Sequence, residues 1–187
     1  FEAGVRMIGL THFFDNELGG SAHGQSQAGL TAFGKEVVNK MNEKGIFIDL
    51  AHCSPAIVDD VLAMTDKPVI VSHTGVRGVL DSPRNLSDLH IQKIAENGGI
   101  IGIAFFDEAV GVPELPNIIA SIKHVRDLVG IEYVALGSDY DGAVAVPFDI
   151  TGFPLLVEGM MNQGFNETEI QAVMGENIKR FFLQNLN

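Results

Sequence analysis

The chain has 187 residues, with 12 Lys and Arg against 24 Asp and Glu, and its formal net charge is −12. Its 46% hydrophobic residues exclude a disordered chain, and its one cysteine excludes both a disulfide scaffold and a thiolate metal cage. The acidic balance leaves no basic face for a phosphate backbone, and no apolar run reaches the roughly 20 residues that span a bilayer. We therefore expect no nucleic-acid partner and no membrane contact from this segment.

Short apolar runs rich in Ile, Val and Leu recur along the chain and predict β-strands. They cover Met7–Thr11, Ile46–Leu50, Val69–Ser72, Ile100–Phe106 and Val134–Ser138. The runs lack a clean alternation of apolar and polar residues. Near-continuous apolar strands of this kind are typical of a parallel sheet that is covered on both faces.

Helical patterns separate these runs. The predicted helices begin near Thr31, Ser54, Ser87, Pro116 and Asn166. Strands that alternate with helices at roughly 30 residues per unit predict an α/β protein. Two architectures remain open: a doubly wound sheet, which about five strands complete, and a (β/α)8 TIM barrel, which typically needs about 250 residues. Length favours the doubly wound sheet, whereas the functional residues favour a partial barrel of about five βα units.

Histidines follow three of the predicted strands at the same position. His12, His52 and His73 stand just past the ends of the first three apolar runs, and Asp139 stands past the last one. All strand ends of a parallel sheet open on one side, so these side chains should converge. Core packing gives no reason for this recurrence, whereas metal binding by neutral imidazole does. We therefore predict a shared metal or catalytic site.

The remaining histidines, His23, His90 and His124, lie in a polar loop or on predicted helices, and we expect them at the surface. The lone Cys53 has no evident base beside it and is expected to be a small buried residue.

Two other residues have competing interpretations. Asp139 and Asp141 imitate the start of a calcium loop, but the acidic ligands that should follow are missing, so an EF-hand is not predicted. Arg84 lies in a turn-rich loop after the strand that bears His73. It either binds a substrate carboxylate through its planar fork or pairs with a surface aspartate.

The order and spacing of these motifs resemble those of the membrane dipeptidase (renal dipeptidase) family, which are zinc hydrolases of the amidohydrolase-like metal-dependent barrels. The resemblance extends over residues 1–187. It rests on the segments Gly4–His12, Gly29–Gly34, Ile48–Ser54, Pro68–His73, Pro83–Asn85, Asn97–Gly99 and Gly137–Gly142.

The resemblance implies a role for each matching residue. His52 and His73 would bind one zinc of a binuclear pair that shares a bridging hydroxide. His12 would bind or polarise the scissile carbonyl, Arg84 would bind the substrate carboxylate, and Asp139 would manage the proton for the leaving amine. The implied substrate is a dipeptide, with mixed L,D forms among the candidates.

The chain also departs from the family pattern. The family's His-x-Asp pair and its metal-bridging Glu precede the strand that opens this chain, and no His here has Asp two residues later. We therefore expect residues 1–187 to be the C-terminal portion of the barrel, with one zinc or none in this fragment and little activity alone. Exposed strand edges predict self-association or pairing with the missing N-terminal part. Two alternatives stay open: a non-catalytic half-barrel that binds a partner or small molecule, and another amidohydrolase reaction such as deamination or lactone hydrolysis.

Overall fold

A computed structural model of the chain describes residues 1–186, and its centre is a five-stranded sheet. The strands are β1 (Met7–Gly9), β2 (Phe47–Asp49), β3 (Ile70–Thr74), β4 (Ile100–Ile103) and β5 (Val134–Leu136). All neighbouring pairs are parallel, with Ile8 opposite Ile48 and Ile101 opposite Val134. The predicted strands are confirmed, although each hydrogen-bonded ladder covers only part of its apolar run or is shifted along it.

The strand order decides between the two predicted architectures. Each strand pairs with the next one in sequence, in the order β1-β2-β3-β4-β5. A doubly wound sheet reverses its order at a switch point, whereas a barrel adds each new strand to the same edge. The sheet is therefore a partial barrel, and the preference that length alone gave to a doubly wound sheet is wrong.

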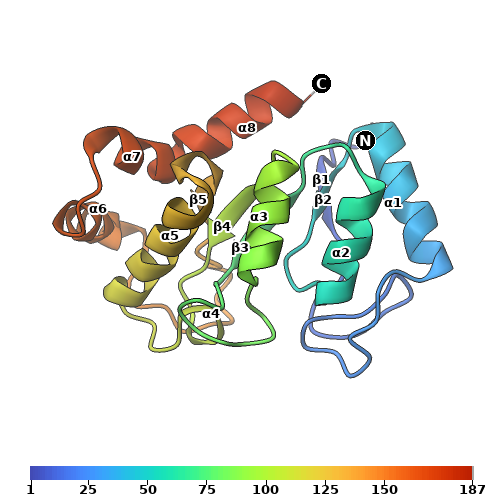
Figure 1. Cartoon of the computed structure of the whole chain (residues 1–187), viewed down its shortest axis with the longest axis horizontal. Coiled ribbons are helices and arrows are strands. Elements are labelled where there is room, and N and C mark those ends of the chain that lie inside the picture. Colours follow the sequence, from blue (N-terminus) through green and yellow to red (C-terminus); the bar gives the residue numbers. More distant parts are fainter. Residues whose placement is uncertain (187) are drawn as a thin grey trace.

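Helices fill the connections between the strands. They are α1 (Ala32–Lys44), α2 (Pro55–Met64), α3 (Asp88–Glu96), α4 (Asp107–Val110), α5 (Leu115–Val129), α6 (Phe153–Asn162), α7 (Glu167–Gln171) and α8 (Asn177–Asn185), with η1 (Ile131–Tyr133), η2 (Ile150–Gly152) and the π-turn η3 (Ala172–Glu176) between them. Figure 1 shows α1, α2, α3 and α5 side by side over one face of the sheet, with the long loops gathered at the opposite end from α8.

The predicted helix starts are confirmed by their caps. The side chains of Thr31, Ser54 and Ser87 each accept a hydrogen bond from a backbone N–H three residues later, at 3.0 to 3.2 Å. Such a bond satisfies one of the donors that the first turn of a helix leaves free. Gly45 ends α1 in the left-handed conformation, with φ +67°, which costs glycine little.

The C-terminal helices differ from their prediction. Asn166 and Glu169 form the expected capping box at the start of α7. The single helix expected from there is interrupted by η3, in which Gly175 has φ +157°. No pattern predicted α6, whose residues Phe153–Asn162 pack against α5.

Two apolar clusters hold the sheet. The larger one lies between the sheet and the helices and contains fully buried side chains such as Ile57, Ile91 and Ile118. The smaller one lies at the N-terminal ends of the strands, where Phe181 of α8 packs with residues of four strands, namely Phe47, Ile70, Ile100 and Ala135. α8 therefore closes this end of the sheet.

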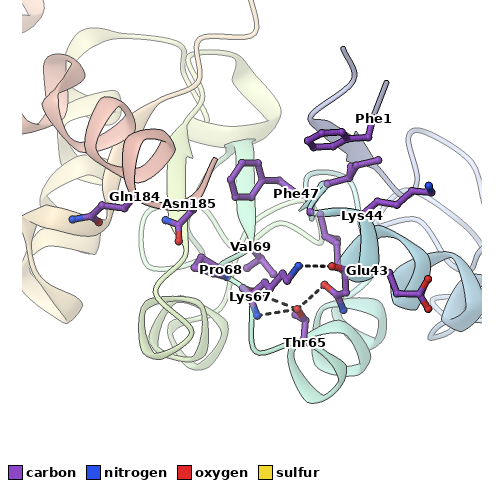
Figure 2. A pocket seen from close by; sticks show the side chains of 14 residues that line it. Phe1, Glu43, Lys44, Phe47, Thr65, Lys67, Pro68, Val69, Gln184 and Asn185 are labelled. Carbon is purple, nitrogen blue, oxygen red and sulfur yellow. Dashed lines mark hydrogen bonds between the residues drawn. The ribbon is translucent and has the colours of Figure 1, made fainter. Parts of the chain in front are cut away.

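A cavity of about 320 Å³ opens beside α8, at this same N-terminal end. Figure 2 shows its wall, where Lys67 donates to the carbonyl oxygen of Asn42 and the Thr65 hydroxyl donates to the Asn42 side chain at 2.9 Å. Lys67, Thr65 and Asn42 thus pair with one another in this wall. The residues singled out from the sequence lie at the other end of the strands.

Candidate active site

The five residues named from the sequence come together at the C-terminal end of the sheet. His12, His52 and Asp139 lie three residues past the ends of β1, β2 and β5, respectively. His73 is the next-to-last residue of β3. Arg84 reaches the same place from the loop after β3, where its Nη2 donates to the carbonyl oxygen of His73 at 2.8 Å. Parallel pairing brings these positions together even though they span most of the chain.

The imidazoles of His52 and His73 face each other at the centre of this group. Their Nε2 atoms are 2.8 Å apart. Burial, and then the positive charge of Arg84, lowers the pKa of His52 to about 2, and the same two causes lower the pKa of His73. Both rings are therefore neutral at pH 7, which is the form that binds a metal ion.

The outer nitrogens of the two rings test whether this pair suits a metal ion. His52 Nδ1 lies 3.2 Å from His23 Nε2, and His73 Nδ1 lies 2.9 Å from the Ser72 hydroxyl. Each Nδ1 thus has a neighbour that can accept its proton, and with both protons there the two Nε2 lone pairs can face a shared ion. Two nitrogens bound tetrahedrally to zinc at about 2.05 Å are roughly 3.3 Å apart, so the two rings would have to move apart by roughly 0.5 Å to share the ion.

The donor set of this segment is small. Within residues 1–186, no three His, Cys, Asp or Glu side chains meet in an arrangement that could hold a metal ion. The described part of the chain therefore offers two imidazoles that suit a shared ion, and further ligands would have to come from elsewhere.

The backbone at two of these positions is in a strained conformation. His52 has φ +62° and Asp139 has φ +63°, and Gln27 is the other non-glycine residue with positive φ in the described chain. Such a conformation costs about 1–3 kcal/mol and persists only where the surroundings impose it. The carbonyl of His52 is held by the Thr11 hydroxyl at 3.0 Å and by the Ala22 N–H at 2.8 Å. The chain thus holds the ring of His52 in place against its own preference.

Arg84 is a buried cation with an incomplete set of partners. Its side chain is 6% exposed, and its guanidinium lies 5.9 Å from the centre of the Phe106 ring. Burial lowers its pKa to about 10, so it remains charged at pH 7. Within the described residues 1–186, its buried Nε has no hydrogen-bond partner. A buried donor without an acceptor costs free energy, so an anionic ligand at this place would relieve it.

A cavity of about 300 Å³ adjoins these groups and contacts His52, Arg84 and Asp139. Asp139 Oδ1 lies 3.9 Å from His73 Nε2. His12 is exposed, and the centre of its ring lies 4.3 Å from that of His52. Cationic, anionic and neutral polar groups therefore converge on one space.

Asp141 does not belong to this group. It is exposed and accepts a hydrogen bond from the Ala143 N–H at 2.7 Å within a turn. Cys53 is buried, as expected, and burial raises the pKa of its thiol to about 12, so it is not a nucleophile at neutral pH.

The prediction that the other three histidines lie at the surface is wrong for His90, which is buried, and holds only in part for His23 and His124. His23 is half-buried against His52. His90 has a side chain only 10% exposed, which packs between α2 and α3 and lies 3.5 Å from Asp59. His124 is half-buried and lies 2.7 Å from Asp88. Each gains burial from a neighbouring element that is remote in sequence.

Asp49 was not singled out from the sequence, although it supports the site. It is buried at the end of β2, and its Oδ1 accepts from the Ala51 N–H at 3.0 Å and the Ser72 N–H at 2.9 Å. One carboxylate thus joins the segments that precede His52 and His73. Its only sequence signal is an acidic residue at the end of an apolar strand.

Comparison with family models agrees with this geometry. The model described as "Membrane dipeptidase (Peptidase family M19)" matches residues 1–186. The chain belongs to this family. The resemblance seen in the motifs is confirmed, and membership makes this segment part of a metallopeptidase fold.

Curated dipeptidases from distant organisms are similar to this chain. Dipeptidase 3 of Mus musculus is 33% identical over 199 aligned residues, which cover 98% of this chain and 40% of that protein. Dipeptidase verJ of Clonostachys rogersoniana is 34% identical over 187 residues, covering 96% of this chain and 48% of that protein. The chain therefore spans less than half the length of these relatives.

Two solved structures are similar to this chain over most of its length and are themselves covered in part. A metallopeptidase of Rhodobacter sphaeroides, liganded with a phosphinate mimic of the dipeptide L-Ala-D-Ala, superposes with a TM-score of 0.86 at 27% identity, over 98% of this chain and 57% of that one. An amidohydrolase of Pseudomonas aeruginosa superposes with a TM-score of 0.88 at 27% identity, over 98% of this chain and 65% of that one.

In the part of this chain that the structure describes, no helix has the length and apolar character needed to cross a bilayer.

Proposed function

We propose that this chain is the C-terminal portion of a zinc dipeptidase that hydrolyses the peptide bond of dipeptides, with mixed L,D forms among its substrates. The observation that carries the proposal is the pair of neutral imidazoles, His52 and His73, whose Nε2 atoms face each other at 2.8 Å beside a buried arginine. Membership of the M19 family and the L-Ala-D-Ala mimic in the Rhodobacter sphaeroides relative support the substrate class.

His52 and His73 would hold one zinc ion through Nε2. A bound zinc ion supplies a Lewis acid that polarises the substrate carbonyl and lowers the pKa of an attacking water. The chain itself keeps both rings neutral by burial and turns their Nδ1 atoms toward hydrogen-bond acceptors.

The remaining side chains would position the substrate. Arg84 carries a buried positive charge and borders the 300 Å³ cavity, which suits the free carboxylate of a dipeptide. His12, which is exposed beside His52, would bind the scissile carbonyl oxygen. Asp139 would carry the proton to the leaving amine, because its carboxylate lies 3.9 Å from His73 and borders the same cavity.

The rest of the site would come from other βα units. A closed barrel has eight units, and this chain supplies five strands. About three further units would therefore carry the ligands of a second zinc. Two protein imidazoles alone are too few for a closed catalytic site, so we expect the isolated chain to be inactive or nearly so.

The test compares this chain with a polypeptide that joins it to the three preceding βα units, each assayed for hydrolysis of L-Ala-L-Ala and L-Ala-D-Ala with added zinc. We expect turnover by the longer polypeptide only. A longer polypeptide that binds zinc but cleaves neither dipeptide would contradict the dipeptidase proposal. Robust turnover by the 187-residue chain would contradict only its incompleteness.

Arg84 separates dipeptide hydrolysis from other amidohydrolase reactions. In the active polypeptide, Arg84→Met should raise KM for dipeptides with a free carboxylate and leave KM for carboxyl-blocked dipeptides unchanged. An equal effect on both substrates would argue against carboxylate binding and reopen deamination or lactone hydrolysis.

The edge of β1 supports self-association or pairing with the missing part. Val5, Met7 and Ile8 are 44%, 40% and 38% exposed along this edge strand. An unpaired apolar edge is a site for pairing with another chain. Light scattering of the isolated chain should therefore show dimers or larger species, and a stable monomer would contradict this expectation.

A further inference from the structure

His23 occupies an unusual place for a residue of a polar surface loop. Its side chain is 19% exposed, and its Nε2 lies 3.2 Å from Nδ1 of His52. The two residues are 29 positions apart in sequence, and the loop after β1 brings them together. His73, by contrast, finds a partner for its own Nδ1 in the adjacent residue, Ser72.

The loop holds His23 firmly in this position. The His23 N–H donates to the Ser21 hydroxyl at 3.1 Å, and the Asp15 carboxylate accepts from three backbone N–H groups of the loop at 2.9 to 3.1 Å. The Gln27 amide also donates to three backbone carbonyls of the same loop, at 3.0 to 3.1 Å. The ring is therefore presented by an ordered turn.

Glu108 lies beside the outer nitrogen of His23. Its Oε2 lies 3.8 Å from Nδ1 of His23. A neutral imidazole carries one proton, and a carboxylate beside Nδ1 favours the tautomer with the proton on that nitrogen. The Nε2 of His23 is then an acceptor. His52 must donate its Nδ1–H to it, which leaves the Nε2 lone pair of His52 free toward His73.

The opposite direction of the hydrogen bond between His23 and His52 would block metal binding at His52. If His23 donated from Nε2, His52 would accept at Nδ1 and carry its proton on Nε2, between the two facing rings. We propose that His23, oriented by Glu108, is a positioning residue that holds His52 in the tautomer with a free Nε2. This inference rests on the proposed function, in which His52 binds zinc. It adds a residue and a carboxylate that lie outside the set of residues predicted from the sequence.

The test reads the tautomer directly and the metal affinity separately. Imidazole ¹⁵N spectra of the zinc-free chain report which nitrogen of His52 carries the proton, and competition with a chromophoric chelator reports zinc affinity. We expect His52 to be protonated on Nδ1 in the wild type. His23→Ala should lose this preference and bind zinc about 10–100-fold more weakly. His23→Gln should restore both properties, because its amide oxygen can accept near the position of Nε2.

Two matched variants cover the possibility that His23→Ala does not fold. Glu108→Lys changes an exposed side chain and puts an ammonium donor near Nδ1 of His23, so it should shift His52 toward the Nε2–H tautomer and weaken zinc binding. Asp107→Lys makes the same charge change next to it and should leave the tautomer unchanged. The distant His124→Ala controls for the loss of one histidine.

The outcomes separate the two proposals. An unchanged His52 tautomer in both His23→Ala and Glu108→Lys would overturn the role of His23. If His52→Ala leaves zinc affinity unchanged, the proposed metal function fails, while the tautomer of His52 still decides whether His23 orients it. Loss of the tautomer together with loss of zinc affinity, rescued by His23→Gln, supports the positioning role.

Discussion

The two ends of one sheet are built in opposite ways. At the N-terminal end, Phe47, Ile70 and Ile100 pack with Phe181 of α8 into an apolar cluster. At the C-terminal end, the same strands lead to His52, with positive φ, and to a buried arginine that lacks a full set of partners. At the N-terminal end the apolar side chains are buried against one another, whereas at the C-terminal end polar side chains face a cavity.

The difference shows where stability and chemistry reside in this fold. Buried apolar packing at the N-terminal end supplies stability. Strained or unpaired groups at the C-terminal end cost stability but present atoms that can bind a ligand. The two ends should therefore respond differently to substitution. Changes at the N-terminal end should alter unfolding without altering zinc binding, whereas changes at the C-terminal end should weaken zinc binding.

The largest expected effect is on folding. Phe181→Ala removes a side chain that is 5% exposed and should lower the free energy of unfolding by about 3–5 kcal/mol, measured by urea titration. Leu183→Ala on the same helix, at 75% exposure, is the control and should change little. Under conditions in which both variants are folded, their zinc affinity should equal that of the wild type. Weaker zinc binding by folded Phe181→Ala would contradict the idea that the two ends of the sheet act independently.

The next effect is on zinc. His52→Ala removes one of the two facing nitrogens and should weaken zinc binding at least about 100-fold, or about 2.7 kcal/mol, in a chelator competition. His124→Ala should leave the affinity unchanged. The loss of unfolding free energy should be smaller than for Phe181→Ala. Equal zinc affinity in wild type and His52→Ala would show that the facing pair does not bind the ion.

Asp49 tests whether the C-terminal end contributes any stability through its polar groups. Asp49→Ala leaves the N–H groups of Ala51 and Ser72 without their acceptor and should cost about 1–3 kcal/mol of unfolding free energy. It should also weaken zinc binding about 10–100-fold, because both histidine segments lose a shared anchor. Asp49→Asn keeps an acceptor oxygen and should lose less of both. A larger loss with Asn than with Ala would contradict this role.

The smallest effect is a pH dependence from the helix layer. Burial lowers the pKa of His90 below its ordinary 6.5, although Asp59 opposes this shift and Lys93 and Arg77 reinforce it. The unfolded chain therefore takes up the proton first, so stability is lost as pH falls below 6.5. His90→Gln should make this loss shallower in unfolding measurements between pH 7.5 and 5. An unchanged slope would place the pH dependence in the site histidines instead.

Local patterns predicted the scaffold well. The five strands and the capped starts of α1, α2 and α3 follow from short-range physics: apolar runs, a hydroxyl before a helix and a glycine after one. The interruption at Gly175 and the helix α6 were missed. A π-turn and a helix packed on α5 depend on contacts that no local pattern records.

The candidate site was predictable only in part. The positions of His12, His52, His73 and Asp139 after strand ends imply convergence, because parallel strands share one direction. Their roles in binding zinc and substrate stay predictions. His23 was predicted to lie at the surface, and its partial burial was missed because it comes from a loop that folds across to β2.

The sequence by itself determined the α/β class, the five strands and the capped helix starts, since these depend on residues close together in the chain. It determined the family through the order and spacing of motifs along the chain. The tertiary structure decided the strand order and the hydrogen bonds that Asp49 accepts from Ala51 and Ser72. It also decided that His23 lies between Glu108 and His52. Those features depend on contacts between remote segments, and a single sequence does not specify their geometry. The folded loop after β1 brings Nε2 of His23 within 3.2 Å of Nδ1 of His52, which is 29 residues away.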